Sequence, residues 1–228
     1  MITNDQCWMR DMCIKGRANQ CPSPFCIKLF KIDNLYSQAL ISEKQRKHVN
    51  LRIDADGSDK DAFKILKGIE ENIETFISEG QNLYLHSITY GCGKTSWALR
   101  LAEAYINKIW YKTDLQCKIL FIHVPKFLIS LKESISKPNE YVDHIKENFL
   151  NADLVIFDEI ASKNNTEYEM EQLLNIINSR LDEGKSNIYT SNLTDDELAS
   201  KVGGRLASRI LGMSTNITFV GKDKRGLK

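Results

Sequence analysis

The stretch Gly91-Cys92-Gly93-Lys94-Thr95 lies between an apolar run, Leu83-Tyr84-Leu85, and a helical pattern that begins near Ser96. A strand, a glycine-rich turn and a helix in this order form the phosphate-binding corner of nucleotide-hydrolysing folds. The glycines let backbone N–H groups turn toward phosphates, the lysine reaches the β- and γ-phosphates, and the threonine hydroxyl ligates Mg²⁺. The sequence therefore predicts a site for ATP or ADP with Mg²⁺. Its expected ligands are Gly91, Cys92, Gly93, Lys94, Thr95 and Ser96.

The phosphate-loop pattern G-x-x-x-x-G-K-T asks for a glycine at position 88, where this chain has Ile88. We expect this departure to reduce nucleotide affinity or turnover without removing the site. The alternative is a chance glycine turn before a helix, which the downstream sequence disfavours. Cys92 is interpreted as a small filler of the loop rather than as a redox switch.

Charge and hydropathy restrict the class of protein. The 228 residues include 31 basic and 30 acidic ones, so no global basic field favours nucleic acid, and any such contact must be local. No apolar run reaches the roughly 18 residues that a membrane span needs, and the N-terminus has no signal-peptide pattern. We therefore expect a cytoplasmic protein without membrane contact. In that compartment thiols stay reduced, so the six cysteines suggest metal rather than disulfides.

Apolar runs and helical patterns alternate from Asn82 onward, and runs such as Leu154-Val155-Ile156-Phe157 are continuously apolar. Alternation of this kind predicts an α/β fold, a parallel sheet with helices on both faces. The expected strands span 82–87, 117–124, 153–158, 186–191 and 216–220. The expected helices span 95–108, 125–133, 139–149 and 166–183.

The chain divides into three parts by composition. Residues 29–57 are polar and weakly periodic, which predicts a short helix or arm near 42–48 and then a connector. Ser58-x-x-Asp61 has the pattern of a helix N-cap, and apolar residues recur at helical spacing until Gly80. We therefore predict one long amphipathic helix over 58–80. The expected division is an N-terminal module at 1–45, a linker at 46–57 and the ATPase domain at 58–228.

Asp158 and Glu159 end an apolar strand downstream of the phosphate loop. At the carboxyl end of a strand, Asp158 can hold the water shell of Mg²⁺, and Glu159 can act as general base on the attacking water. The alternative is that the pair only caps the next segment. In P-loop ATPases with an extra strand between the phosphate-loop strand and the Asp-Glu strand, a polar residue after the following strand contacts the γ-phosphate. Asn192 is the candidate, unless it forms an ordinary Asx turn.

Two arginines, Arg205 and Arg209, lie on one face of a predicted helix. An arginine supplied across a subunit boundary can stabilise charge on the γ-phosphate, so self-association through the ATP site is expected. Arginines at this spacing on a helix are otherwise a solvated face. His86, His123 and His144 show no metal-ligand pattern and are interpreted as structural.

Four cysteines fall near the N-terminus, at Cys7, Cys13, Cys21 and Cys26. Four thiolates suffice for a tetrahedral Zn²⁺ site, on which so small a segment would fold. An iron–sulfur cluster and four unrelated free thiols are the two alternatives.

Together these features resemble the AAA+ family, and within it the DnaC/DnaI-type replicative helicase loaders, most of all loaders encoded by phages. The resemblance covers about residues 82–226 and rests on the phosphate loop, Asp158-Glu159, the segment 190–193 and the box Gly204-Arg205-x-x-Ser208-Arg209. It implies the AAA+ fold of the additional-strand class, with Arg209 as first choice and Arg205 as second for the arginine that acts on a neighbour. Because the sequence stops at Lys228, we expect no C-terminal helical lid.

The resemblance also implies partners: a hexameric replicative helicase, which the cysteine-containing module would dock, and single-stranded DNA. Lysines and aromatics that could bind a single strand follow the second predicted strand, although a solvated helix face would look the same. They are Lys126, Phe127, Lys132, Lys137, Tyr141 and Lys146. The predicted function is ATP-dependent helicase loading. The alternatives are an AAA+ transposition helper and a non-catalytic adaptor or inhibitor of the loading machinery.

Overall fold

The computed structural model describes residues 26–47, 51, 57–161 and 166–223. Within them, five strands form one sheet in the order β2-β3-β4-β1-β5, and every neighbouring pair is parallel. β4 lies between β1, which precedes the phosphate loop, and β3, which ends in Asp158. The additional strand therefore has its predicted position. The strands are β1 (Asn82–His86), β2 (Ile119–His123), β3 (Leu154–Asp158), β4 (Ser186–Ser191) and β5 (Thr215–Thr218).

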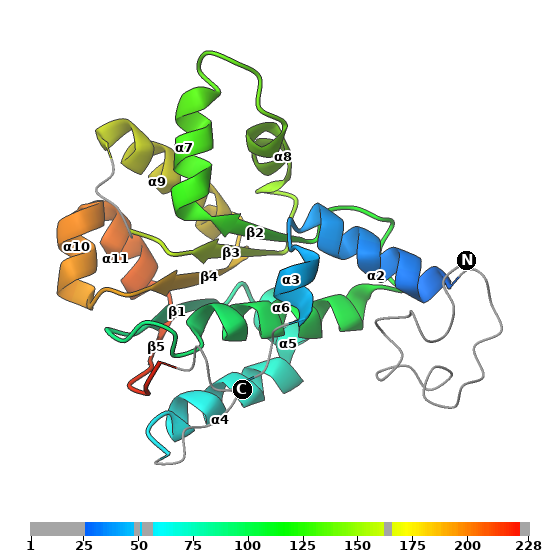
Figure 1. Cartoon of the computed structure of the whole chain (residues 1–228), viewed down its shortest axis with the longest axis horizontal. Coiled ribbons are helices and arrows are strands. Elements are labelled where there is room, and N and C mark those ends of the chain that lie inside the picture. Colours follow the sequence, from blue (N-terminus) through cyan, green and yellow to red (C-terminus); the bar gives the residue numbers. More distant parts are fainter. Residues whose placement is uncertain (1–25, 48–50, 52–56, 162–165, 224–228) are drawn as a thin grey trace.

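Helices cover both faces of the sheet (Figure 1). One face carries α2 (Ile27–Gln38), α4 (Lys60–Glu71), α5 (Ile73–Ser78) and α6 (Lys94–Ile109). The other carries α7 (Val124–Glu133), α8 (Glu140–Asn148), α9 (Glu167–Asp182), α10 (Asp195–Val202) and α11 (Gly204–Gly212). The short α3 (Glu43–Lys47) follows α2. Among the described helices, none combines the length and apolarity that crossing a membrane requires.

The strands alternate between two buried clusters. In β1, Leu83 and Leu85 join the cluster under α2 and α6, whereas Tyr84 joins the cluster on the opposite face. A strand buried on both faces must be apolar at nearly every position, which explains the continuous runs in the sequence. The predicted α/β fold with a parallel, doubly covered sheet is confirmed.

The predicted single helix over 58–80 is wrong, because the structure has two helices there, α4 and α5. Asn72 separates them with φ −110° and ψ 31°, and its side-chain amide donates to the carbonyl of Gly68 at 2.9 Å. A side chain that binds the preceding turn competes with continuation of the helix. The break lets Ile73 and Phe76 of α5 pack into the core.

The predicted cap at Ser58 also differs, since α4 begins at Lys60 and Asp59 takes the N-cap position. The Asp59 side chain makes no capping hydrogen bond. It accepts instead from the backbone N–H groups of Val220 and Gly221, at 2.8 and 3.0 Å. This carboxylate therefore joins the start of α4 to the segment that follows β5.

Helix α2 belongs to the core, although the sequence here is polar and weakly periodic. Its buried residues are Leu29, Ile32, Leu35 and Tyr36, and they share a cluster with β1, β2 and α6. The N–H of Phe121 in β2 donates to the carbonyl of Ala39, just after α2, at 2.8 Å. The packed core thus extends upstream of residue 58. The first 25 residues of the predicted module lie outside the described residues, so a separate module there stays a prediction.

Candidate active site

The phosphate loop connects β1 to α6 at the carboxyl edge of the sheet. Gly91 and Gly93 have φ values of 72° and 107°, and Gly93 occupies the N-cap position of α6. A residue with a Cβ is strained in this region, so both glycines are needed for the loop to turn into the helix. Ile88, at the position of the missing glycine, is 73% exposed and does not fill the loop.

Lys94 is the first residue of α6 and is only 7% exposed. Its ammonium group donates to the carbonyl of Thr89 at 3.4 Å and to Cys92 Sγ at 3.5 Å. Cys92 is itself buried inside the loop. The lysine is therefore folded back over the loop, where its charge adds to the N–H dipoles at the start of α6.

Asp158 is 4% exposed and accepts two hydroxyl hydrogen bonds on the same oxygen. Thr95 Oγ1 donates to Oδ1 at 2.7 Å, and Thr190 Oγ1 donates to it at 2.9 Å. Burial raises the pKa of this carboxyl, although the two hydroxyls oppose the shift. The contact joins the first turn of α6 to the ends of β3 and β4. The sequence does not predict this role for Thr190, which it indicates only as part of the segment 190–193.

Glu159 adopts a left-handed backbone conformation, with φ 57°, immediately after β3. Its N–H donates to Thr190 Oγ1 at 3.0 Å, which helps to hold this uncommon conformation. His123 Nε2 lies 3.8 Å from Glu159 Oε2, because the sheet register pairs His123 with Asp158. His123 is therefore adjacent to the site, whereas the sequence suggests only a structural role. His86 contacts Thr218, and His144 contacts the carbonyl of Gln38.

A cavity of about 160 Å³ brings most of the predicted residues together. Glu159 and Asn192 line it together with the phosphate loop, so residues far apart in the sequence share one site. The full lining is Gly91, Cys92, Gly93, Lys94, Thr95, Ser96, Glu159, Thr190, Ser191 and Asn192. Asp158 lies behind this wall and contacts it through Thr95 and Thr190.

Arg205 and Arg209 do not line this cavity. Both are on α11, which confirms the predicted helix, and both are exposed while Leu206 and Ile210 of the same helix are buried. Their guanidinium groups are therefore available at the molecular surface rather than in the chain's own site.

The donors beside the loop fit Mg²⁺. Thr95 and Asp158 present a hydroxyl and a carboxylate oxygen 2.7 Å apart, the hard oxygen donors that this cation prefers. The predicted zinc or iron–sulfur ligands Cys7, Cys13 and Cys21 lie outside the described residues, and Cys26 is partly buried just before α2. In the described part of the chain, no group of three or more His, Cys, Asp or Glu side chains could hold a metal.

Comparison with known proteins places this geometry in a family. A scan against family models matches residues 58–216 to the bacterial DnaA ATPase domain. The fold resembles that of the DnaC helicase loader, at 19% identity over 78% of this chain and 99% of that chain, with a TM-score of 0.61. It also resembles DnaI, at 22% identity over 78% of this chain and 89% of that chain, with a TM-score of 0.56.

A third similar structure is the replication initiator DnaA bound to AMPPCP and single-stranded DNA. The identity is 16% and the TM-score 0.58, over 78% of this chain and 50% of that chain. This chain thus spans half the length of that initiator. A search of curated proteins found no match.

The strand order, the phosphate loop and the carboxylates at the end of β3 define a P-loop ATPase fold of the additional-strand class. The family match covers well over half of the sequence, and the chain belongs to the family of the bacterial DnaA ATPase domain. Its fold is also that of DnaC and DnaI, which confirms the resemblance to AAA+ proteins of the helicase-loader type.

Proposed function

We propose that this chain binds ATP with Mg²⁺ and hydrolyses it. The observation that carries this proposal is that Thr95 and Thr190, which line the cavity together with Glu159, both donate hydrogen bonds to Asp158. Thr95 and Asp158 would hold the cation, which when bound offsets charge on the β- and γ-phosphates.

The remaining residues of the cavity have distinct proposed roles. The Lys94 ammonium group leaves the Thr89 carbonyl and Cys92 Sγ and binds the β- and γ-phosphates. Glu159 accepts a proton from the attacking water, with its backbone fixed by Thr190. Asn192, which lines the same cavity, orients the γ-phosphate and the water. Catalysis in this scheme is mainly positioning and charge stabilisation.

We further propose that the active site is completed by a second copy of the chain. Arg205 and Arg209 are exposed on α11 and do not line the cavity of their own protomer. A guanidinium group on such a surface can reach the γ-phosphate held by a neighbour. Arg209 is the preferred candidate, and ATP would then favour self-association.

The cellular role that fits best is loading of a hexameric replicative helicase onto single-stranded DNA. Support comes from the fold shared with the DnaC helicase loader, nearly all of whose chain is matched. In this proposal residues 1–45, with their cysteines and Zn²⁺, dock the helicase, while α2 within this range also packs against the ATPase domain. Residues 58–228 form the ATPase domain.

Contact with single-stranded DNA is proposed for α7 and α8. Lys126 Nζ lies 4.3 Å from the centroid of the Tyr141 ring, so a cation and an aromatic face are already paired across these two helices. Lys132, Lys137 and Lys146 are exposed nearby. Lysines interleaved with an aromatic ring are the elements that bind a single strand without sequence preference. The similar DnaA structure contains single-stranded DNA.

Native mass spectrometry with a hexameric replicative helicase tests this function. The full-length chain and its Glu159→Gln variant are each mixed with the helicase in ATP and in ADP. We expect several copies per hexamer in ATP, release as the unmodified chain hydrolyses ATP, and retention by Glu159→Gln. Turnover is followed in parallel, with and without single-stranded DNA.

The outcomes separate the two parts of the proposal. Turnover that Glu159→Gln abolishes, without any helicase complex, would leave the ATPase intact and refute the loader. Unchanged turnover in Glu159→Gln would refute the assignment of Glu159 as base. A complex that forms equally in ATP and ADP, without turnover, would indicate a non-catalytic adaptor.

A further inference from the structure

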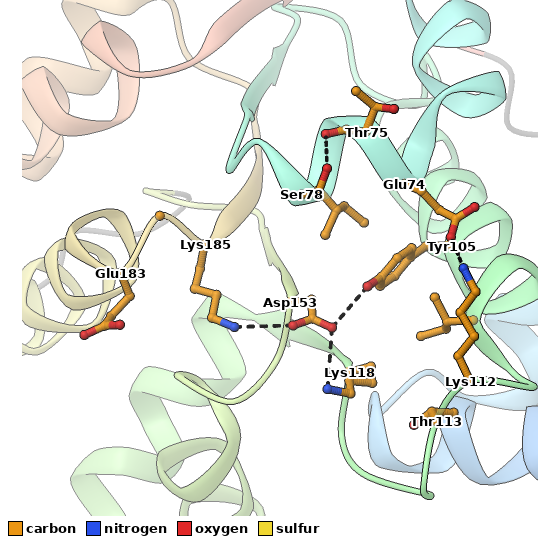
Figure 2. A pocket seen from close by; sticks show the side chains of 13 residues that line it. Glu74, Thr75, Ser78, Tyr105, Lys112, Thr113, Lys118, Asp153, Glu183 and Lys185 are labelled. Atoms are coloured by element: carbon orange, nitrogen blue, oxygen red, sulfur yellow. Dashed lines mark hydrogen bonds and ion pairs between the residues drawn. The ribbon is translucent and has the colours of Figure 1, made fainter.

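A second cavity, drawn in Figure 2, lies at the amino edge of the sheet, whereas the phosphate loop lies at the carboxyl edge. Its volume is about 650 Å³, compared with about 160 Å³ for the cavity at the loop. α5 and the end of α6 form one side. Lys118, Asp153 and Lys185, which immediately precede β2, β3 and β4, form the other. Parallel strands bring these three residues to one edge although they are distant in the sequence.

Asp153 is the centre of a charged cluster on this wall. Its Oδ1 accepts from Lys185 Nζ at 3.3 Å, its Oδ2 lies 3.7 Å from Lys118 Nζ, and the Tyr105 hydroxyl donates to Oδ2 at 3.1 Å. Both lysine side chains remain partly accessible. Each ammonium group has three donors, so one shared carboxylate leaves donors for a further acceptor.

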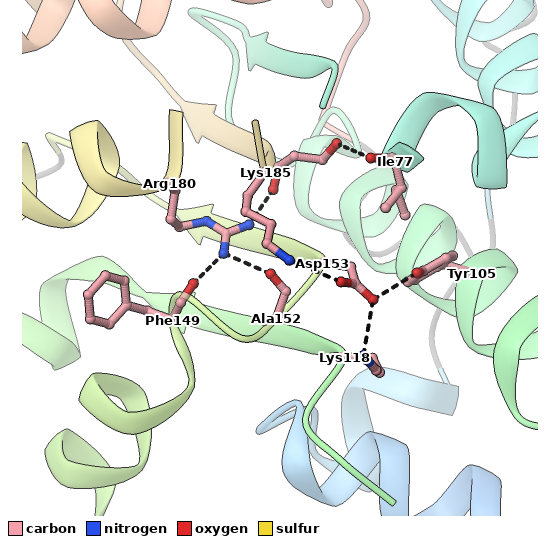
Figure 3. Close-up of polar contacts among 9 residues, drawn as sticks. Ile77, Tyr105, Lys118, Phe149, Ala152, Asp153, Arg180 and Lys185 are labelled. Atoms are coloured by element: carbon pink, nitrogen blue, oxygen red, sulfur yellow. Dashed lines mark hydrogen bonds and ion pairs between the residues drawn. The ribbon is translucent and has the colours of Figure 1, made fainter. Parts of the chain in front are cut away.

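Arg180 lies directly behind this cluster and is fully buried (Figure 3). Its guanidinium donates to the side-chain oxygen of Asn187 and to the carbonyls of Phe149, Ala152 and Ser186. None of these acceptors is a carboxylate. Burial lowers the pKa of Arg180 to about 10, which leaves it charged at neutral pH. Because Ala152 and Ser186 adjoin Asp153 and Lys185, the guanidinium both fixes the cluster and adds positive charge.

The charges do not balance in the immediate surroundings of Asp153, although the lining as a whole contains three lysines and three carboxylates. Three cations, Lys118, Lys185 and Arg180, accompany the single carboxylate of Asp153. Elsewhere in the cavity Lys112 pairs with Glu74 at 2.7 Å, and the Glu183 carboxylate points away from Asp153 (Figure 2). A phosphate monoester carries a charge of about −1.5 to −2 at neutral pH, which would offset the surplus.

The rest of the lining suits the apolar part of an organic molecule rather than an inorganic ion alone. Ile77, Ile109 and the ring of Tyr105 provide apolar surface. Thr113 Oγ1 is buried and has no hydrogen-bond partner within the described residues. The volume falls in the range of roughly 300–1,000 Å³ that small-molecule sites occupy.

We infer that this cavity binds a small organic phosphate monoester, with the phosphate between Lys118 and Lys185 and the apolar body against Ile77 and Ile109. Lysine acts on phosphate as a point charge and needs no planar, two-pronged geometry, so two ammonium groups held by Asp153 can share one phosphate. The site is separate from the phosphate loop and does not depend on ATP hydrolysis.

An NMR titration of the full chain with phenyl phosphate tests the inference, because this probe has a phosphate and an apolar ring but no nucleobase. Saturating ADP and Mg²⁺ occupy the phosphate loop, and a second arm uses the Lys94→Ala variant to disable that loop. We expect amide shifts at residues 74–78, 112–113 and 184–185 in both arms. Shifts confined to residues 91–96, or no shifts at millimolar probe, would overturn the inference.

Charge variants then locate the phosphate. Lys118→Met and Lys185→Met should each weaken binding at least about tenfold, the effect of losing one charged hydrogen bond. The matched control is Lys222→Met, because Lys222 is exposed and follows β5, at the carboxyl ends of the strands rather than at the amino ends. Equal affinity in all three variants would refute the placement. If a lysine variant fails to fold, the titration of the unmodified chain still decides whether the site exists.

Discussion

At the residue scale, Asp158 accepts hydrogen bonds from Thr95 and Thr190 and has almost no contact with solvent. Burial raises its pKa above the ordinary carboxyl value of 3.8. Between that value and the higher folded-state pKa, the folded chain binds more protons than the unfolded chain. The free energy of unfolding therefore falls as the pH rises through this range. At neutral pH the ionised carboxylate destabilises the fold, as expected where function opposes stability.

We predict that Asp158→Asn is more stable than the unmodified chain at pH 7.5. The amide stays neutral, and its oxygen can still accept from both hydroxyls. The variant should also lose Mg²⁺-dependent nucleotide binding. Urea unfolding at pH 5 and pH 7.5 measures the effect, which should be smaller at pH 5. Asp196→Asn, at an exposed site on α10, is the control. A variant less stable than the unmodified chain at pH 7.5 would contradict the argument.

The chemistry at Asp158 could be predicted only in part. The phosphate loop and the Asp-Glu pair are contiguous motifs, so their residues could be named from the sequence. Thr190 and His123 belong to neither motif. They reach Asp158 and Glu159 because β4 and β2 flank β3 in a particular register, which is a property of the assembled sheet.

At the scale of elements, Asp59 joins two segments that are distant in the sequence. It precedes α4, is 4% exposed, and accepts from two backbone N–H groups after β5. Buried N–H groups that lose their acceptor retain the full cost of desolvation. The carboxylate therefore fixes the end of the edge strand β5 to the start of α4.

We expect Asp59→Ala to lower the free energy of unfolding by about 2–4 kcal/mol, since two charged hydrogen bonds are lost together. Asp59→Asn should lose less, because its oxygen remains an acceptor. Asp61→Ala, at an exposed position of α4, should change stability by less than about 0.5 kcal/mol. Urea unfolding of the three variants at pH 7 makes the comparison. Similar losses for Asp59→Ala and Asp61→Ala would show that the junction contributes nothing specific.

The positions of β1, β2, β3 and β4 were predictable because these strands are buried along nearly their whole length, whereas β5 is mostly exposed. The positions of the helices were less predictable from the sequence. Over 58–80, apolar spacing continues through Asn72, and only the side-chain bond to Gly68 shows where the helix ends. In α2, the buried residues Leu29, Ile32 and Leu35 have helical spacing. The charged and polar residues between them weaken the pattern, and the sequence does not reveal that this helix covers the sheet.

At the scale of the whole molecule, the cavities at the carboxyl and amino ends of the parallel strands differ in how far the sequence predicts them. The carboxyl edge is built mainly from two short motifs, so the sequence locates its cavity. The cavity at the amino edge is assembled from α5, α6 and single residues before three strands. No spacing in the sequence relates Lys118, Asp153 and Lys185, and only the parallel topology brings them together.

The exposed position of Arg209 leads to a prediction about the assembly. If the arginine acts on nucleotide held by a neighbour, Lys94→Ala and Arg209→Ala should each lose ATPase turnover when alone. Arginines in this role contribute roughly 10³–10⁵ to the rate. A mixture of equal amounts should regain activity, because a site with an intact Lys94 can then meet an intact Arg209. Each site is formed by two neighbouring copies in a head-to-tail contact. If the copies associate at random, about a quarter of the sites therefore combine an intact Lys94 with an intact Arg209.

The mixture is measured by steady-state ATP turnover at a concentration where the unmodified chain self-associates. Arg205→Ala mixed with Lys94→Ala is the matched comparison, since both arginines are exposed on α11. Recovery with the Arg209 variant would follow only from a site shared between copies, because neither protein alone has a complete set of residues. A mixture no more active than the sum of its parts would refute the action of Arg209 on a neighbour's nucleotide, and unchanged turnover in Arg209→Ala alone would place Arg209 outside the reaction.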